Sequence, residues 1–220
     1  YITWRRGQPK KRGSGPISDR TVNKEIAELS AFFTWCIADL EIYSKVNPCY
    51  MKKIKTNIQR EVFLTPAELS ELLDKSKREG YLIYSAVFIV VSSGLRKGEL
   101  FEIRYRDIDF EFARMFVRAS TTKTKEPRTV PIPGYLLEYI KWMRNQAVDK
   151  EGRIFQAWAT TEWLDNAFER VRKKLSFNPL PNGTNLHFHD LRHVYAQTLR
   201  DLGVDLQDIQ AFLGHSSVTV

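Results

Sequence analysis

The feature of this sequence that most constrains its fold is an apolar run that stops at a glycine and is followed two residues later by an arginine. The run from Tyr81 to Ser93 has the length of a buried helix. Its most apolar part, Tyr81 to Val91, is about half as long as the ~20 residues needed to span a bilayer. Gly94 lacks a side chain and can adopt the left-handed backbone that ends a helix. The sequence therefore predicts that Arg96 begins the next helix, where backbone N–H groups and the helix dipole favour an anion.

Two further compact motifs follow this one much later in the chain. The motif around Arg96 reads Ser-Gly-Leu-Arg96-Lys-Gly-Glu99-Leu. The two later motifs are His189-Asp-Leu-Arg192-His193 and Leu213-Gly-His215. Arginine presents a planar, permanently charged fork that matches phosphate oxygens, and an imidazole can move protons near neutral pH. We therefore expect one site that holds a single phosphate, with a phosphodiester as the substrate.

The charge of the chain agrees with a polyanionic partner. The net charge is +8 and the sequence pI is about 9.4. The excess is uneven, because residues 1–60 contain 12 basic and 5 acidic side chains and the remainder contains 22 and 21. This asymmetry favours two domains, and a solvated basic face without a ligand is the alternative reading of the charge alone.

The two cysteines, Cys36 and Cys49, have no metal-type pairing nearby. A disulfide framework is therefore not expected, both side chains are predicted to be small buried hydrophobes, and a reducing cytoplasm is the expected location. No membrane segment or signal peptide is expected. The chain opens on Tyr1 in what resembles the tail of a helix, so we expect the natural N-terminus to lie upstream.

The first 17 residues have the composition of a basic loop that follows DNA phosphates. Its cations are Arg5, Arg6, Lys10, Lys11 and Arg12. From Ser18, a plausible N-cap, a long amphipathic helix is predicted. Its apolar stripe is Val22, Ile26, Leu29, Phe33, Ile37 and Leu40. Three residues off the stripe are candidate DNA contacts, with simple solvation as the alternative: Arg20, Asn23 and Lys24.

A new domain is predicted after a break at Asn47-Pro48 and a basic linker. Thr65-Pro66-Ala67-Glu68 is a capping box with proline at the first helical position. The segment 109–133 predicts a small antiparallel sheet with Lys123 and Lys125 at a polar tip. Further helices are expected over residues 135–147, 161–175, 189–202 and 206–213. The predicted fold class is mainly α with one small antiparallel β-sheet.

Together these motifs resemble those of the tyrosine recombinases, the phage-integrase family of site-specific DNA recombinases. The two arginine motifs and the Leu-Gly-His element match in order and approximate spacing. The segment Thr-Lys123-Thr-Lys125-Glu-Pro-Arg128-Thr-Val-Pro is similar to the family's β-hairpin lysine segment, in which Lys123 is favoured over Lys125 as the catalytic lysine. The resemblance implies a partial helical core-binding domain over residues 1–57 and a catalytic domain over residues 58–220. Two such domains would clamp double-stranded DNA, with four protomers joining two duplexes.

The resemblance also implies a role for each matching residue. Arg96 and Arg192 would bind the non-bridging oxygens of the scissile phosphate and stabilise its charge without a metal or other cofactor. Lys123 would protonate the departing 5′ oxygen, His189 would assist proton transfer at the nucleophile, and His215 would hydrogen-bond the phosphate. Further residues are expected to support the site or contact DNA: Lys97, Glu99, Lys125, Asp190 and His193.

The nucleophile of the family is a tyrosine that forms a 3′-phosphotyrosyl bond. Family spacing places it roughly nine residues after His215, beyond Val220. Tyr195 lies a helical turn from Arg192, where a role in the core is expected. The chain as given is therefore expected to bind DNA without cleaving it.

Two rival functions fit parts of the pattern. The four histidines, His187, His189, His193 and His215, raise the possibility of a metal-dependent nuclease, with the middle two on one helix face. No carboxylate or cysteine cluster completes such a site, and two arginines would repel a cation. The second rival is a non-catalytic DNA-binding regulator or accessory protein on the same fold.

Overall fold

The computed structural model describes residues 1–10, 15–43, 45–50, 52–55, 62–119, 126–158 and 160–214. Contacts group the chain into two compact units, residues 1–60 and 61–220.

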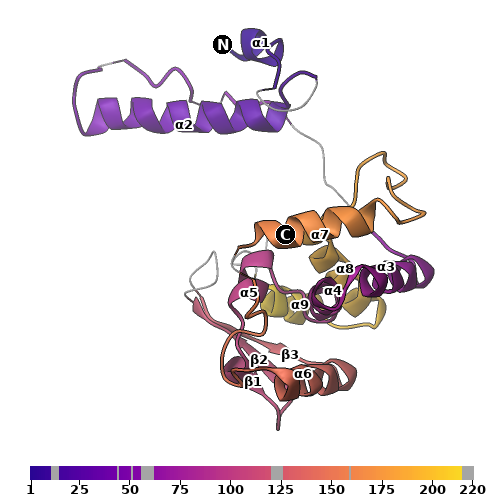
Figure 1. Ribbon diagram of the computed structural model, residues 1–220. Helices are drawn as coiled ribbons and strands as arrows, with labels where there is room; N and C mark the ends of the chain where they lie inside the picture. The colour runs from indigo at the N-terminus through magenta and orange to yellow at the C-terminus, as the bar shows by residue number, and fades with distance from the viewer. Residues whose placement is uncertain are drawn as a thin grey trace. The chain divides into compact units, whose positions relative to one another are not determined.

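The first unit is built around one long helix. A short helix α1 (Ile2–Arg6) precedes α2 (Asp19–Ala38), and the Ser18 side chain caps α2 by accepting from the backbone N–H of Thr21. The chain then runs back along α2 (Figure 1), where the amide of Asn23 donates to the carbonyl of Ile54 and accepts from its N–H, both at 2.8 Å. Ile17, Val22 and Ile26 form its small buried core. The predicted long helix and its cap are confirmed.

The basic segment starts with α1, as expected of a chain that opens in the tail of a helix, and ion pairs of Arg5 with Glu25 and of Arg6 with Asp19 hold α1 to α2. The structure differs from the sequence-based expectation in the burial of this unit. The apolar stripe is buried only at its start: Val22 and Ile26 are buried, whereas the exposed fractions of Leu29 and Leu40 are 37% and 41%. The described part of this unit has too few elements to cover the second half of α2. Cys36 is buried, as expected, but Cys49 is only half-buried.

The second unit is mainly helical. Its helices are α3 (Pro66–Glu79), α4 (Tyr81–Ser93), α5 (Lys97–Glu102), α6 (Gly134–Gln146), α7 (Glu162–Arg172), α8 (Leu191–Asp201) and α9 (Leu206–Leu213). The capping box at Thr65 is present, with Glu68 and Thr65 bonded reciprocally. Helix α4 packs between α3 and α8, and Ile83, Ala86 and Ile89 are at most 1% exposed. The predicted buried helix is therefore confirmed.

A three-stranded antiparallel sheet, in the order β1-β2-β3, lies with α6 at one end of this unit (Figure 1). Its strands are β1 (Ile108–Asp109), β2 (Arg114–Val117) and β3 (Arg128–Pro131), with Met115 opposite Val130 and Val117 opposite Arg128. The predicted class, mainly α with one small antiparallel sheet, is confirmed. The tip that contains Lys123 and Lys125 lies outside the described residues. Among the helices that the structure describes, none is long and apolar enough to cross a membrane.

Candidate active site

Gly94 brings the two arginine motifs together at the end of α4. Its φ of 65° and ψ of 19° are left-handed and end the helix, as the sequence predicts. A Cβ atom at this position would lie 2.4 Å from a ring carbon of Tyr195. Helix α8 can therefore approach α4 closely enough for Arg192 to donate to the Gly94 carbonyl at 2.7 Å.

Arg192 is a buried cation. Its exposed fraction is 4%, and its guanidinium donates to the carbonyl oxygens of Gly94 and Leu213. Within the part of the chain that the structure describes, no carboxylate lies within ion-pair distance of it. Burial, followed by the nearby charge of Arg96, lowers its pKa to about 9. An isolated buried charge is costly, so this site is electrostatically prepared for an anion.

Arg96 lies at the N-cap of α5 and is held by a buried carboxylate. Its Nη1 donates to Glu99 Oε1 at 2.8 Å and its Nη2 donates to the carbonyl of Gly214 at 2.9 Å. Its backbone N–H donates to Glu99 Oε2. The N–H of Arg96 itself therefore already has a partner, and Arg96 offers an anion its side chain.

Glu99 connects Arg96 to a third arginine, Arg128. Two parallel hydrogen bonds from Arg128 reach the two carboxylate oxygens, at 2.9 and 2.6 Å, and Glu99 is 2% exposed. Burial alone would raise the pKa of Glu99, but the hydrogen bonds from Arg128 and Arg96 lower it to about 2. The expected supporting role of Glu99 in the arginine motif agrees with this geometry.

The C-terminal end of α9 is bound by all three arginines. Arg128 Nε donates to the carbonyl of Phe212, Arg192 to that of Leu213, and Arg96 to that of Gly214. The last carbonyls of a helix have no partner within the helix and carry its negative dipole end, which favours cations. The first two residues of the third motif, Leu213 and Gly214, are thereby held against the two arginine motifs.

His189 lies beside this cluster on the solvent side. Partial burial lowers its pKa, and the neighbouring His193 and Arg192 lower it further. A neutral imidazole at pH 7 can accept a proton. His189 belongs to a 3₁₀ turn (Phe188–Asp190) that precedes α8 and not to the helix itself, and the rings of His189 and His193 meet edge to face at 5.9 Å. Asp190 is 4% exposed and accepts from the backbone N–H of His187.

A cavity of about 320 Å³ opens next to His189 between α5 and α7. Lys97 and Arg172 line it together with His187. Lys97 donates to both carboxylate oxygens of Asp165, at 3.0 and 2.8 Å, across these two helices. Lys97 therefore has a structural partner, and a DNA contact would have to share or replace it.

The other candidate DNA contacts fall into two groups. Arg5 forms an ion pair with Glu25, Arg6 forms one with Asp19, and Asn23 bonds the backbone of Ile54. Arg20 and Lys24 are exposed, and Lys24 forms a surface ion pair with Glu28 at 4.0 Å. Lys10 is described next to the bridge between Pro9 and Pro16. The remaining predicted site residues lie outside the described residues: Lys11, Arg12, Lys123, Lys125 and His215.

The metal alternative finds no support in the described part of the chain. No group of three or more His, Cys, Asp or Glu side chains there could hold a metal ion.

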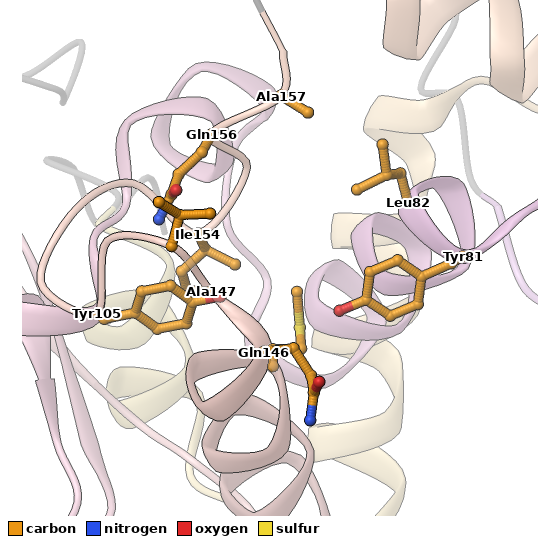
Figure 2. A pocket seen from close by; sticks show the side chains of 10 residues that line it. Tyr81, Leu82, Tyr105, Gln146, Ala147, Ile154, Gln156 and Ala157 are labelled. Carbon is orange, nitrogen blue, oxygen red and sulfur yellow. The ribbon is translucent and has the colours of Figure 1, made fainter.

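A second cavity, of about 440 Å³, lies at the opposite end of α4 from Arg96 (Figure 2). Its walls include Tyr81, Leu82, Tyr105 and Met143, with the amides of Gln146 and Gln156, and no Asp, Glu, Lys, Arg or His lines it. With no cationic side chain in its lining, it is unsuited to a phosphate.

Comparison with known proteins agrees with the family that the sequence motifs resemble. The sequence pattern of the phage integrase family matches residues 62–220. The chain belongs to the phage integrase family. A tyrosine recombinase of Thermosipho africanus is 30% identical over 213 residues, which cover 91% of this chain and 69% of that protein. A XerC-like tyrosine recombinase of Caldanaerobacter subterraneus is 26% identical over 243 residues, and the match covers 92% of this chain but only 61% of that longer protein.

Solved structures share the integrase fold. The Tn1549 transposon integrase in complex with circular intermediate DNA has a TM-score of 0.71 and 22% identity, covering 92% of this chain and 73% of that one. A lambda integrase dimer bound to a COC′ core site has a TM-score of 0.71 and 21% identity, covering 91% and 74%. At such identities the likeness shows the fold of this integrase-family chain.

Sequence reasoning missed part of the cluster. The sequence places Arg128 only in the segment that resembles the β-hairpin lysine segment, and no pattern in the sequence marks the carbonyls at the end of α9. The burial of Arg128 between Glu99 and Phe212 depends on how β3 packs against α9, which only the folded chain shows.

Proposed function

We propose that this chain is the DNA-binding and phosphate-activating part of a site-specific recombinase that breaks and rejoins DNA through a 3′-phosphotyrosyl intermediate. The observation that carries the proposal is Arg192, a buried cation whose described contacts are neutral carbonyls, placed beside Arg96. A phosphodiester supplies the missing negative charge, and two guanidinium groups stabilise the extra charge that develops on its oxygens as the nucleophile attacks.

The family resemblance assigns the remaining steps of DNA cleavage to four further residues. A tyrosine phenol attacks phosphorus, the bond to the 5′ oxygen breaks, and Lys123 gives that oxygen a proton. His189, whose pKa is lowered by burial and by His193 and Arg192, assists proton transfer at the nucleophile. His215 hydrogen-bonds the phosphate. The proposal requires no metal and no cofactor.

Residues 1–220 by themselves are proposed to bind DNA without cleaving it. No tyrosine follows His215 in this sequence. Tyr195 is 4% exposed, and burial raises its pKa to about 12, so its phenol is a poor nucleophile in a closed position. Residues 1–57 would act as a partial core-binding domain and residues 58–220 as the catalytic domain, in the cytoplasm, with four copies on two DNA duplexes.

A selection experiment followed by phosphate replacement tests this function. Duplexes that bind the chain are enriched from a random library, which should yield a defined sequence. Each phosphate of that duplex is then replaced singly by an uncharged methylphosphonate, and the affinity is measured for the wild type and for Arg192→Ala. We expect one position where the replacement weakens wild-type binding by about tenfold, the loss of one charge-assisted hydrogen bond. This position-specific loss should become clearly smaller in Arg192→Ala, in which only Arg96 still binds that phosphate.

Two outcomes speak against the proposal. If no sequence is enriched, the chain does not recognise a specific DNA site. If the methylphosphonate effect has the same size in the wild type and in Arg192→Ala, Arg192 does not bind the phosphate.

A further inference from the structure

Arg128 is the most completely engaged arginine of the cluster. Its side chain is 8% exposed. Nε donates to the Phe212 carbonyl at 2.7 Å, and the two terminal nitrogens donate to the two oxygens of Glu99. All three nitrogens therefore have protein partners, and Arg128 is poorly placed to bind a substrate itself.

The contacts of Arg128 converge on the two groups that hold Arg96. One of these groups is Glu99 Oε1, which accepts from both Arg96 Nη1 and Arg128 Nη1 at 2.8 and 2.9 Å. The other is the carbonyl of Gly214, which accepts from Arg96 Nη2. Arg128 lies against that residue as well: a Cβ on Gly214 would be 2.9 Å from Arg128 Cδ.

This arrangement leaves Arg96 with a fixed guanidinium and unused donors. An arginine has five N–H donors, and the side chain of Arg96 uses two of them, one to Glu99 and one to Gly214. Its side chain is 22% exposed, so the remaining donors can reach a ligand. The direction of these donors is fixed only as long as Glu99 and Gly214 stay in place. Arg128 donates to Glu99 and lies against Gly214.

The charge balance points the same way. Glu99 is a buried carboxylate between two arginines, and without Arg128 it would pair with Arg96 alone. Arg96 could then turn further into Glu99 and away from an incoming phosphate, because a buried carboxylate gains most from a bidentate partner.

We propose that Arg128 is a positioning residue that orients the guanidinium of Arg96 toward the scissile phosphate, acting through Glu99 and through the turn at Gly214. This inference rests on the proposed function, and it assigns Arg128 no contact with DNA. Two consequences follow. Loss of Arg128 weakens the binding of the scissile phosphate. It leaves the protein's contacts with the other phosphates of the duplex unchanged.

The selected duplex and its methylphosphonate derivative at the critical position provide the test. Arg128→Gln keeps a polar side chain but removes the charge and the fork, and Arg128→Lys keeps the charge and is the more conservative variant. In both we expect the tenfold methylphosphonate effect of the wild type to fall to about threefold or less, since a misaligned Arg96 loses most of one charge-assisted hydrogen bond. The affinity for the methylphosphonate duplex itself should stay at the wild-type value, which a general structural defect would not allow.

Arg118→Gln is the matched control. Arg118 also forms an ion pair with a largely buried carboxylate, but that carboxylate is Asp107, at 2.7 Å, and Arg118 donates as well to the carbonyl of Glu102. This variant should keep the full methylphosphonate effect. If Arg128→Gln fails to fold, Arg128→Lys carries the comparison.

The outcomes separate the two proposals. A wild-type methylphosphonate effect that is unchanged in Arg128→Lys and in a folded Arg128→Gln overturns the positioning role and leaves the proposed function standing. A parallel loss of affinity for both duplexes assigns Arg128 a structural role only and also overturns the inference. Absence of any position-specific effect in the wild type overturns the proposed function, and the inference falls with it.

Discussion

At the residue scale, Gly94 determines whether the two arginine motifs can meet. We predict that Gly94→Ala destabilises the second unit by about 2–4 kcal/mol, because a left-handed φ is unfavourable for alanine and the new methyl would overlap a packed ring. The φ is 65°, and the added Cβ would lie 2.4 and 2.8 Å from two ring carbons of Tyr195. Urea unfolding followed by circular dichroism measures the loss. Gly98→Ala is the control: nothing lies within 4 Å of its added Cβ, so it should be neutral or slightly stabilising, and equal losses in the two variants would refute the steric explanation.

Also at the residue scale, Glu99 should make the stability of this unit depend on pH. Its folded-state pKa is about 2 and its ordinary value is 4.5. The pKa is depressed, so the stabilisation is present above pH 4.5 and is lost as the pH falls toward 2. The shift corresponds to about 3 kcal/mol, of which more than half is lost by pH 3. Urea unfolding between pH 6 and pH 3 should show a shallower loss for Glu99→Gln than for the wild type, and equal slopes would contradict the prediction.

At the element scale, the helix caps are independent enough to be tested singly. Thr65 Oγ1 accepts from the backbone N–H of Glu68 at 3.2 Å, and the Glu68 carboxylate accepts from the Thr65 N–H at 2.7 Å. Thr65→Ala should therefore cost about 1 kcal/mol of unfolding free energy. Thr65→Ser retains the hydroxyl and should cost much less. Thermal or urea unfolding of the pair checks this, and a serine variant as unstable as the alanine variant would exclude the cap as the cause.

Elements with a local signature were predictable, and those that depend on distant packing were not. The cap at Thr65, the apolar run of α4 and the stop at Gly94 are each decided within a few residues, and all three appear in the structure. The uneven burial of α2 was not predictable, because periodicity says which side of a helix is apolar and not whether another element covers it. The same limit applies to the candidate site: the motifs alone single out Arg96 and Arg192, but the contacts of Arg128 depend on the packing of β3 against α9.

At the scale of the whole molecule, the charge distribution predicts how DNA binding responds to salt. The net charge is +8, and residues 1–60 hold 12 basic and 5 acidic side chains. Each phosphate neutralised contributes about −0.9 to the slope of log affinity against log salt concentration. Replacing the two exposed cations of α2, Arg20→Gln with Lys24→Gln, should therefore make the slope shallower by about 1 to 2. Titrations of a duplex of unselected sequence between 50 and 200 mM salt, conditions over which such slopes are measured, give the value.

The matched control removes charge from the second unit instead. Lys141→Gln with Lys173→Gln also replaces two cations; each forms an ion pair with a neighbouring glutamate, Glu138 or Glu169. Because the excess charge lies in residues 1–60, this double variant should change the slope much less than the α2 variant. Equal changes would mean that total charge alone, and not its placement on α2, sets the affinity. An unchanged slope in the α2 variant would remove Arg20 and Lys24 from the DNA contacts while leaving the arginine cluster at Arg192 untouched.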